Sequence, residues 1–498
     1  MSFGPLGAQT TRPVVMGRNG VVVAGHHLAA QAGLDMLKSG GNAIDAAIAT
    51  AAALAVLKPD ACGLGSDLFL LYSEARTGKT YALNASGPAP QAATLAEYAN
   101  GIPEHGLRAS AVPGAVHGWE NAITRFGRRS LSEALAPAIA LAANGIPVSN
   151  LFAAILERNA AILQPFPATT EIFFPRGTAP QAGEVLVQGY AARTLEAIAA
   201  GGAAAFYAGP FAHALEVHAR ETNAPMRAGD LRDYRSEWRE PVHATFRDVE
   251  LIAQPPVSVG IVVLEALRIL ATTPISTYDD ASADFIHTHV EAMKLARVNL
   301  HTQLADPAFA TKMASDTSYM AVIDAEGNAV SLLQSIFAIF GSAAVIPGTG
   351  VLMNNRMTGF SLDPASPNVL APGKRTLHTL NPLMVHKGGR LLMCLGTPGA
   401  AGQTYTNSLL VMRMIERGYG VQRAVEAPRW FVGMDGKLQI EDSVGQATLD
   451  ELARRGHELT VLPRLHPGVG GAGVVRINEH GVRESGADPR RESYAVAY

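Results

Sequence analysis

The stretch ASDTSYMAVIDAEGNAVS, residues 314–331, places a threonine directly before an alternating, strand-like segment that ends at a Glu-Gly-Asn turn. A β-branched residue often begins a strand, so Thr317 has an ordinary structural interpretation. It also has a chemical one. If the chain is cut between Asp316 and Thr317, the new α-amine lies beside the threonine hydroxyl and can act as the base that this weak nucleophile needs. The local pattern leaves both interpretations open.

Composition and charge exclude several classes of protein. Of the 498 residues, 48% are hydrophobic and 17% are charged, which is typical of a globular chain. The net charge is -3 and the basic residues are scattered, so we expect no nucleic-acid partner. The longest apolar stretch, residues 46–57, is shorter than the roughly 20 residues that span a bilayer, and the N-terminus lacks a signal-peptide pattern. We therefore expect a soluble, cytoplasmic protein with no membrane partner.

Thiol and metal chemistry have little support in the sequence. Cys62 and Cys394 each lie in apolar surroundings, so we expect two buried free thiols and a reducing compartment. His287 and His289 are two residues apart on a predicted helix, which points their rings to different faces. The chain has no HExxH motif and no paired CxxC motif. We expect neither a metal site nor a cofactor.

Hydrophobic periodicity predicts helices and strands in a mixed arrangement. Residues 27–57 predict two helices separated by Ser39-Gly40-Gly41, and AARTLEAIAAGG predicts a helix that ends at its glycine pair. After residue 317 strands predominate, followed by the predicted helix TNSLLVMRMIERG. We expect two sheets packed between helix layers. The predicted strands are LFLLYSEA (68–75), TYALNAS (80–86), TSYMAVID (317–324), AVSLLQSIFAIF (329–340), LNPLMVHK (380–387) and RLLMCLGT (390–397).

A glycine-rich loop, GTPGAAG (396–402), follows a predicted strand and precedes a helix. It imitates a phosphate-binding loop, but no acidic ribose partner can be placed about 20 residues further on. Its backbone N–H groups are equally suited to hold an oxyanion. The chain has no G-x-S-x-G elbow and neither cysteine has a catalytic context, so Thr317 is the candidate nucleophile.

Several blocks of the sequence, in the same order, resemble the γ-glutamyltransferase (γ-glutamyltranspeptidase) family of N-terminal-nucleophile hydrolases. The resemblance extends over nearly the whole chain. The blocks are GHHLAAQAGLDMLKSGGNAIDAAIATAAALAVLKPDACGLGSDLFLLY (25–72), VPGAVHGWENAITRFGRRSLSEALAPAIALAANGIPVS (112–149), DTSYMAVIDAEGNAVSLLQSIFAIFGSAAVIPGTGVLMNNRM (316–357), GKRTLHTLNPLMV (373–385) and LGTPGA (395–400).

The resemblance implies an α/β (α+β) fold, an αββα sandwich built by two associated fragments of one self-cleaved precursor, 1–316 and 317–498. It implies that Thr317 is the nucleophile, that its new amine is the base and that an acyl-enzyme forms. The Ser335 hydroxyl would assist the nucleophile. The backbone N–H groups of Gly399 and Ala400 would form the oxyanion hole, where the family has a Gly-Gly pair.

The substrate-binding positions depart from the family pattern. Ser86 stands at or near an arginine that binds the α-carboxylate of γ-glutamyl groups, and Gly359 at or near an aspartate that binds their α-amine. His378-Thr379 replaces a Ser-Ser pair. Arg356 is a candidate for a substrate carboxylate, with a solvated surface arginine as the alternative. The candidate substrate-binding residues are Ser86, Asn355, Arg356, His378 and Thr379.

These departures favour an amidohydrolase acting on a small carboxylate-bearing amide, with oxamate as the first candidate. The Asp-Thr junction and the His-Thr-Leu-Asn-Pro loop (378–382) are similar to those of oxamate amidohydrolases, members of the same superfamily. One alternative is a γ-glutamyl hydrolase or transferase acting on glutathione-like substrates. Another is an inactive relative that only binds ligands. A homo-oligomer of the paired fragments is compatible with the sequence.

Overall fold

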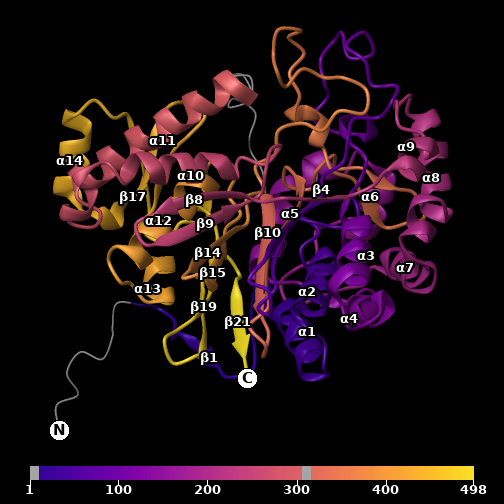
Figure 1. Cartoon of the computed structure of the whole chain (residues 1–498). Coiled ribbons are helices and arrows are strands. Elements are labelled where there is room, and N and C mark those ends of the chain that lie inside the picture. The colour runs from indigo at the N-terminus through magenta and orange to yellow at the C-terminus, as the bar shows by residue number, and fades with distance from the viewer. Residues whose placement is uncertain (1–9, 305–315) are drawn as a thin grey trace.

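The computed structural model describes residues 10–304 and 316–498. Within these residues, two antiparallel sheets face each other and helices cover the outer side of each sheet (Figure 1). Helices α1 to α9 lie on one side of the molecule and helices α10 to α14 on the other, with the strands between them. The structure is therefore the αββα sandwich that the sequence predicts, and the predicted fold class is confirmed.

Both sheets have seven strands in the described part of the chain, and every pairing within them is antiparallel. The first sheet has the order β1 (Val15–Gly17), β20 (Arg483–Ala487), β19 (Gly473–Ile477), β15 (Arg390–Gly396), β14 (Leu383–Lys387), β9 (Val249–Ala253) and β8 (Val242–Phe246). The second has the order β21 (Tyr494–Ala497), β2 (Val21–Ala24), β10 (Asp316–Ile323), β11 (Ala329–Phe337), β3 (Asp67–Ser73), β4 (Thr80–Ala85) and β7 (Glu237–Arg239).

Each sheet contains strands from before and after residue 316. In the second sheet, β10 pairs with β2 on one side and with β11 on the other, and β11 pairs with β3. In the first, β14 lies between β9 and β15. Because the hydrogen bonds of each sheet cross this boundary, neither part of the chain can complete a sheet without the other.

The helices form two layers. The first consists of α1 (His27–Lys38), α2 (Ala43–Leu57), α3 (Ala115–Phe126), α4 (Leu131–Asn144), α5 (Asn150–Leu163), α6 (Pro167–Phe173), α7 (Gly189–Tyr207), α8 (Pro210–Glu221) and α9 (Ala228–Asp233). The second consists of α10 (Gly260–Leu270), α11 (Ala283–Leu304), α12 (Gly402–Ile415), α13 (Val421–Glu426) and α14 (Gln446–Arg454). Short strands complete the chain: β5 (Ile146–Pro147), β6 (Val185–Leu186), β12 (Val345–Ile346), β13 (Val351–Leu352), β16 (Trp430–Val432), β17 (Leu438–Glu441) and β18 (Leu459–Leu462).

Strand β10 is buried on both faces. Tyr319, Ala321 and Ile323 belong to the apolar core between the two sheets. Met320 and Val322 point the other way, into the core between this sheet and the first helix layer. Alternate residues of a strand face opposite sides, so this pattern fixes which side chains of β10 face the opposite sheet.

Helix α2 closes the outer face of the second sheet. It begins with a capping box, in which Asn42 accepts from the backbone N–H of Asp45 and Asp45 accepts from that of Asn42. Each of its fifteen residues is buried, and most are alanine or another small residue. Small side chains allow the helix to approach its neighbours closely, which explains how so apolar a segment is accommodated without spanning a membrane.

The structure confirms the predicted helices within 27–57 and each of the predicted strands. Several boundaries differ by a few residues; strand β14, for example, begins at Leu383, three residues after the predicted start. Helix α7 continues through the glycine pair to Tyr207, with a kink where Gly202 has φ 67°. Strand β11 ends at Phe337, which has φ 82°, instead of at residue 340. Helix α12 starts at Gly402, four residues before the predicted start. No helix in the described residues is long and apolar enough to cross a membrane.

A buried histidine connects the helices of the second layer. The Nε2 atom of His289, in α11, lies 2.8 Å from Ser408 Oγ in α12, and its Nδ1 accepts from the Trp430 indole N–H at 3.1 Å. Burial lowers the pKa of His289 to about 3, with a smaller contribution from Arg413. The ring is therefore neutral in the folded protein at pH 7 and resists protonation far below the usual histidine range.

We predict that stability falls as the pH is lowered from 7.5 to 5. A histidine with a lowered folded-state pKa takes up a proton more readily when unfolded, so below about 6.5 it favours unfolding by up to about 1.4 kcal/mol per pH unit. His289→Gln should reduce the pH dependence of the thermal midpoint, whereas the matched change at an exposed histidine, His480→Gln, should not. An unchanged pH dependence in His289→Gln would contradict this account.

Candidate active site

Thr317 lies at the start of β10 and is 3% exposed. Asp316 pairs with Phe337 and Ser318 pairs with Gln334, so the register shifts at Thr317. A bulge of this kind re-aims one side chain without breaking the sheet. Thr317 and Tyr319 are two residues apart in β10, so their side chains point to the same face, and Tyr319 faces the opposite sheet. Its side chain is thus positioned at the end of the space between the two sheets.

Ser335 and Asp67 continue this row across the sheet. Ser335 in β11 pairs directly with Asp67 in β3, and both side chains are fully buried. The Ser335 Oγ accepts a hydrogen bond from the backbone N–H of Phe337 at 2.8 Å. Leu333 and Phe69, two residues along each strand, pack in the core between the sheets, so Ser335 and Asp67 face the same side. Three adjacent strands therefore contribute one polar side chain each to this end of the sandwich.

The thiol of Cys62 lies close to the candidate nucleophile. Its Sγ is 3.4 Å from Ser318 Oγ and accepts from Gln334 Nε2 at 3.3 Å. Burial raises the pKa of Cys62 to about 12, so the thiol is protonated at neutral pH and is a poor nucleophile. Burial also raises the pKa of Cys394. Both cysteines are free and buried, as the sequence predicts.

The glycine-rich loop before α12 presents two backbone N–H groups. Gly399 has φ 124° and Ala400 has φ 51°, and neither N–H has a hydrogen-bond partner among residues 10–304 and 316–498. A Cβ on Gly399 would lie 3.1 Å from the Cα of Gly470, so only glycine suits this conformation and this contact. Adjacent unpaired N–H groups at the start of a helix are typical of an anion-binding or oxyanion site.

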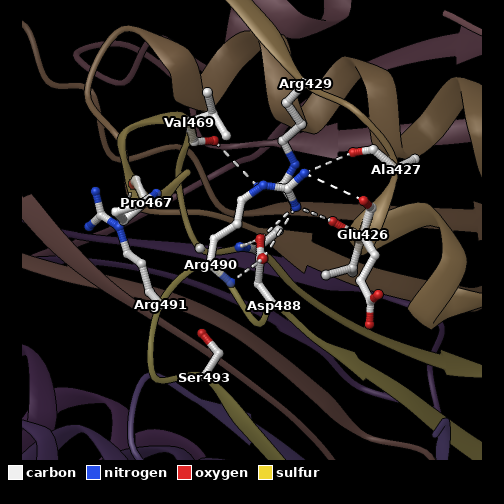
Figure 2. Close-up of polar contacts among 12 residues, drawn as sticks. Glu426, Ala427, Arg429, Pro467, Val469, Asp488, Arg490, Arg491 and Ser493 are labelled. Carbon is white, nitrogen blue, oxygen red and sulfur yellow. Dashed lines mark hydrogen bonds and ion pairs between the residues drawn. The ribbon is translucent and has the colours of Figure 1, made fainter. Parts of the chain in front are cut away.

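A buried ionic network supports that loop from behind (Figure 2). Arg429 and Arg490 converge on the carboxylate of Asp488, at 2.6 Å and 3.3 Å. Asp488 also accepts from the backbone N–H of Ala472 at 2.8 Å, and Arg429 donates to the carbonyl of Val469 at 3.4 Å. These contacts hold the segment that contains Gly470.

The same segment contacts the glycine-rich loop directly, because the N–H of Gly471 donates to Thr397 Oγ1 at 3.1 Å. Burial disfavours the charged form of Asp488, but the two arginines outweigh this effect and lower its pKa. The carboxylate therefore stays ionised, and the network fixes the backbone on which Gly399 rests.

A second buried carboxylate, Asp67, joins three other segments. Its Oδ2 accepts from Arg356 Nε at 2.7 Å and lies 3.1 Å from His378 Nε2, and its Oδ1 accepts from the N–H of Gly87 at 2.8 Å. Burial opposes ionisation of Asp67, but these partners lower its pKa. Burial, with the charge of Arg356, lowers the pKa of His378 to about 4. The cluster therefore holds one negative charge, one positive charge and a neutral imidazole at pH 7.

Arg356 is 1% exposed, so the solvated-surface alternative is wrong. The centre of its guanidinium group lies 4.3 Å from the ring centroid of Phe337. Asp67 pairs with Nε, whereas Nη1 and Nη2 have no hydrogen-bond partner in the described part of the chain. The outer edge of the guanidinium is thus unoccupied by protein groups.

The other candidate substrate-binding residues have mixed surroundings. The hydroxyl of Ser86 donates to Asn84 at 2.7 Å. The side chain of Asn355 accepts from the N–H of Ala338 at 3.0 Å and donates to the carbonyl of Glu104 at 3.2 Å. These two side chains support loops. The hydroxyl of Thr379 is buried and has no partner among the described residues, so it is available to a ligand.

Sequence reasoning missed Asp67 and Phe337. Asp67 ends a glycine-rich turn, GLGSD, and stands at the start of a predicted buried strand. A carboxylate at such a position can be recognised in the sequence, because a buried charge needs a partner. Phe337 carries no such signal, since it resembles an ordinary core residue of a strand. Its contact with Arg356 arises only from the folded chain.

Possible metal ligands gather elsewhere. Among the described residues, the ligand atoms of His287, Glu291 and His457 lie within 4.8 Å of one another, and Glu291 also pairs with Lys294 at 2.8 Å. His289 points away from this group toward Ser408, in agreement with the predicted divergence of the two rings. His287 and Glu291 lie on α11 and His457 follows α14, both in the outer helix layer, and the candidate nucleophile has no part in this group.

Comparisons with known proteins find similarity over nearly the whole chain. A family model described as Gamma-glutamyltranspeptidase matches residues 29–314 and 310–498. The glutathione hydrolase-like YwrD proenzyme of Bacillus subtilis is 37% identical, over 97% of this chain and 99% of that protein. The oxamate amidohydrolase proenzyme of Klebsiella pneumoniae is 34% identical, over 96% and 98%. The crystal structure of a cephalosporin acylase from Bacillus halodurans has a TM-score of 0.92 at 34% identity, covering 100% of this chain and 99% of that one.

We predict that Asp488→Asn destabilises the protein by about 3–5 kcal/mol, because it removes the anion that pairs with the buried Arg429, whereas Arg490 keeps Glu441 at 2.6 Å. Urea unfolding of the variant, compared with the exposed matched change Asp442→Asn, measures the effect. If both variants unfold at the same urea concentration, the network does not hold the segment behind the glycine-rich loop.

Proposed function

The chain belongs to the gamma-glutamyltranspeptidase family, and from this premise we propose that it is a self-cleaving amidohydrolase with Thr317 as its N-terminal nucleophile. The proposed cut lies between Asp316 and Thr317 and gives a large fragment, 1–316, and a small one, 317–498. The observation that carries the proposal is the position of Thr317, buried at the start of β10 and in a row with Ser335. The fragments would stay associated, since both sheets contain strands of each.

Self-cleavage needs no other protein. The Thr317 Oγ attacks the carbonyl carbon of Asp316, the C–N bond breaks, and the hydroxyl proton passes to the peptide nitrogen, which leaves as the α-amine of Thr317. The amide bond is thereby exchanged for an ester. Water then hydrolyses the ester, which releases the Asp316 carboxylate and regenerates the hydroxyl. The irregular register opposite Thr317, where two residues of β11 face one residue of β10, marks this position as a departure from the regular ladder.

Turnover would use the groups that cleavage creates. The free α-amine takes the proton of the Thr317 hydroxyl, and Oγ attacks the carbonyl of the substrate amide. Backbone N–H groups of Gly399 and Ala400 would stabilise the negative charge on the carbonyl oxygen, and Ser335 would orient the nucleophile. The amine then passes its proton to the leaving nitrogen. Water hydrolyses the resulting acyl ester and frees Thr317.

We propose a small carboxylate-bearing amide as the substrate, with oxamate as the first candidate. The buried guanidinium of Arg356 is suited to bind a substrate carboxylate. A relative that is 34% identical is an oxamate amidohydrolase proenzyme. The second candidate is a γ-glutamyl amide, favoured by the glutathione hydrolase-like relative. A cytoplasmic location stays a prediction from the sequence.

We predict that the purified protein releases ammonia and oxalate from oxamate, and that Thr317→Ala does neither and stays one chain. Thr317→Ser, which keeps a hydroxyl, should be cut more slowly and retain part of the activity. Ammonia assays and denaturing gels on the three proteins test this. Equal activity in Thr317→Ala would exclude Thr317 as the nucleophile. Turnover of a γ-glutamyl anilide without ammonia from oxamate would favour the second candidate, and a folded, uncut, inert wild-type chain would favour a binding-only role.

The glycine-rich loop gives a separate prediction for the same reaction. Gly399→Ala should lower kcat about 10²–10³-fold, because the new Cβ displaces a backbone N–H from the oxyanion site. Ala400→Gly should leave kcat nearly unchanged and raise stability by up to about 1 kcal/mol, since alanine is strained at φ 51°. Steady-state kinetics and thermal unfolding of the processed variants measure both. A wild-type kcat in Gly399→Ala would exclude the loop from catalysis.

A further inference from the structure

The guanidinium group of Arg356 is satisfied on one edge only. Its Nε is fixed by Asp67 at 2.7 Å, and its Nη1 and Nη2 are buried without a partner in the described residues. A buried polar group without a hydrogen bond costs about 1–3 kcal/mol, and more when it is charged. Such groups are rare in folded proteins unless a ligand completes them. The ring of Phe337 further restricts how the group can move.

The sheet register places two contacts of Arg356, the residues Phe337 and Asp67, at the end of the sheet where Thr317 lies. Phe337, which stacks with Arg356, is the residue of β11 that pairs with Asp316. Asp67, which orients Arg356, pairs with Ser335. The loop that carries Arg356 is itself joined to β11, because the N–H of Asn355 donates to the carbonyl of Ile336 at 3.1 Å. A ligand on Arg356 would therefore bind near the end of β11 that pairs with Asp316.

We propose that Arg356, oriented by Asp67, binds the carboxylate of the acyl donor, and that this site accepts monoamides of dicarboxylic acids that lack an α-amino group. The proposal rests on the proposed hydrolase function and adds the substrate class. A guanidinium with two free N–H groups in one plane matches the two oxygens of a carboxylate. The unpartnered hydroxyl of Thr379, next in the chain to His378, is a second donor for the same ligand.

Among the described residues, Asp67 is the carboxylate at this site, and its oxygens are largely engaged. Asp67 uses three of its roughly four lone-pair sites on Arg356, His378 and Gly87. No other carboxylate pairs with Arg356 or His378 in residues 10–304 and 316–498. The buried Asp60 is within 3.9 Å of Lys58 instead.

Gly359 takes the place of the acidic residue that the family resemblance implies for the amine. A desolvated ammonium without a partner is strongly unfavourable. An acyl group that carries a carboxylate but no amine, such as an oxamoyl, succinyl or glutaryl group, avoids that penalty.

Calorimetric binding of the acid products tests the proposal without relying on turnover. Oxalate, succinate and glutarate are titrated into the processed wild-type protein and compared with L-aspartate and L-glutamate, which differ from the last two only by the amine. We expect at least one dicarboxylate to bind, and the two amino acids to bind at least 10-fold more weakly than the best of the three acids. Binding of L-glutamate as tight as that of the best dicarboxylate, or no dicarboxylate binding at millimolar concentration, would overturn the proposal.

Matched variants identify the residue responsible. Arg356→Gln should weaken binding of the best dicarboxylate about 10- to 100-fold, the loss expected for one or two charge-assisted hydrogen bonds. Arg390→Gln makes the same change at an exposed arginine, at the turn of the hairpin formed by β14 and β15. This variant should bind the dicarboxylate as tightly as the wild-type protein does. The double variant Asp67→Asn/Arg356→Gln removes both charges, so it avoids a lone buried carboxylate and serves if the single variant unfolds. Wild-type affinity in a folded Arg356 variant would exclude this site.

Cleavage and hydrolysis, measured on the same samples, separate this proposal from the proposed function. If the wild-type protein binds dicarboxylates but hydrolyses none of their monoamides, the hydrolase function fails and the carboxylate site stands. If Arg356→Gln hydrolyses the preferred amide with an unchanged kcat/KM, the carboxylate site fails and the hydrolase function stands.

Discussion

The pairing of β10 with β2 and β11 is the constraint on which the site depends. Both edges of β10 are hydrogen-bonded and both of its faces are buried. A shift or rotation of the strand would therefore disrupt the apolar packing on both faces. Thr317 is the first residue of this strand to face the opposite sheet. Strand β2 pairs with residues 320–323, and β11 pairs with residues on both sides of Thr317, so the backbone that follows the proposed nucleophile is firmly held. Such rigidity is what a reacting group needs, because small displacements are costly in rate.

Two buried ionic groups would act on different parts of the proposed reaction. Asp67 holds Arg356 and His378 at one side, where a substrate carboxylate would bind. Asp488 holds Arg429 and Arg490 behind the glycine-rich loop, where an oxyanion would form. Buried ion pairs contribute little net stability compared with well-packed apolar residues, and their clearest effect is to fix geometry. In the proposed reaction each group would orient one ligand-binding surface relative to Thr317.

Much of this arrangement follows from the sequence, and the parts that do not have a common cause. Local periodicity predicts the helices within 27–57 and the strands after residue 317, because each pattern repeats with the period of its own element. The sequence identifies Thr317 as a candidate nucleophile from its residue type and its position at the start of a predicted strand. The family resemblance adds Ser335, Gly399 and Ala400. Asp67 was missed because its partners are hundreds of residues away in sequence. For the same reason, the sequence did not decide between a ligand-binding Arg356 and a solvated surface arginine, since burial depends on which segments the fold brings together.

The denatured intact mass of the purified protein tests the central claim most directly. The account predicts two species that divide the chain between Asp316 and Thr317, with masses that sum to the full-length chain plus one water molecule, and a small fragment whose first residue is threonine. A single uncut chain after prolonged incubation, or a cut at any other bond, would contradict it. In either case Thr317 would have no free amine to act as its base.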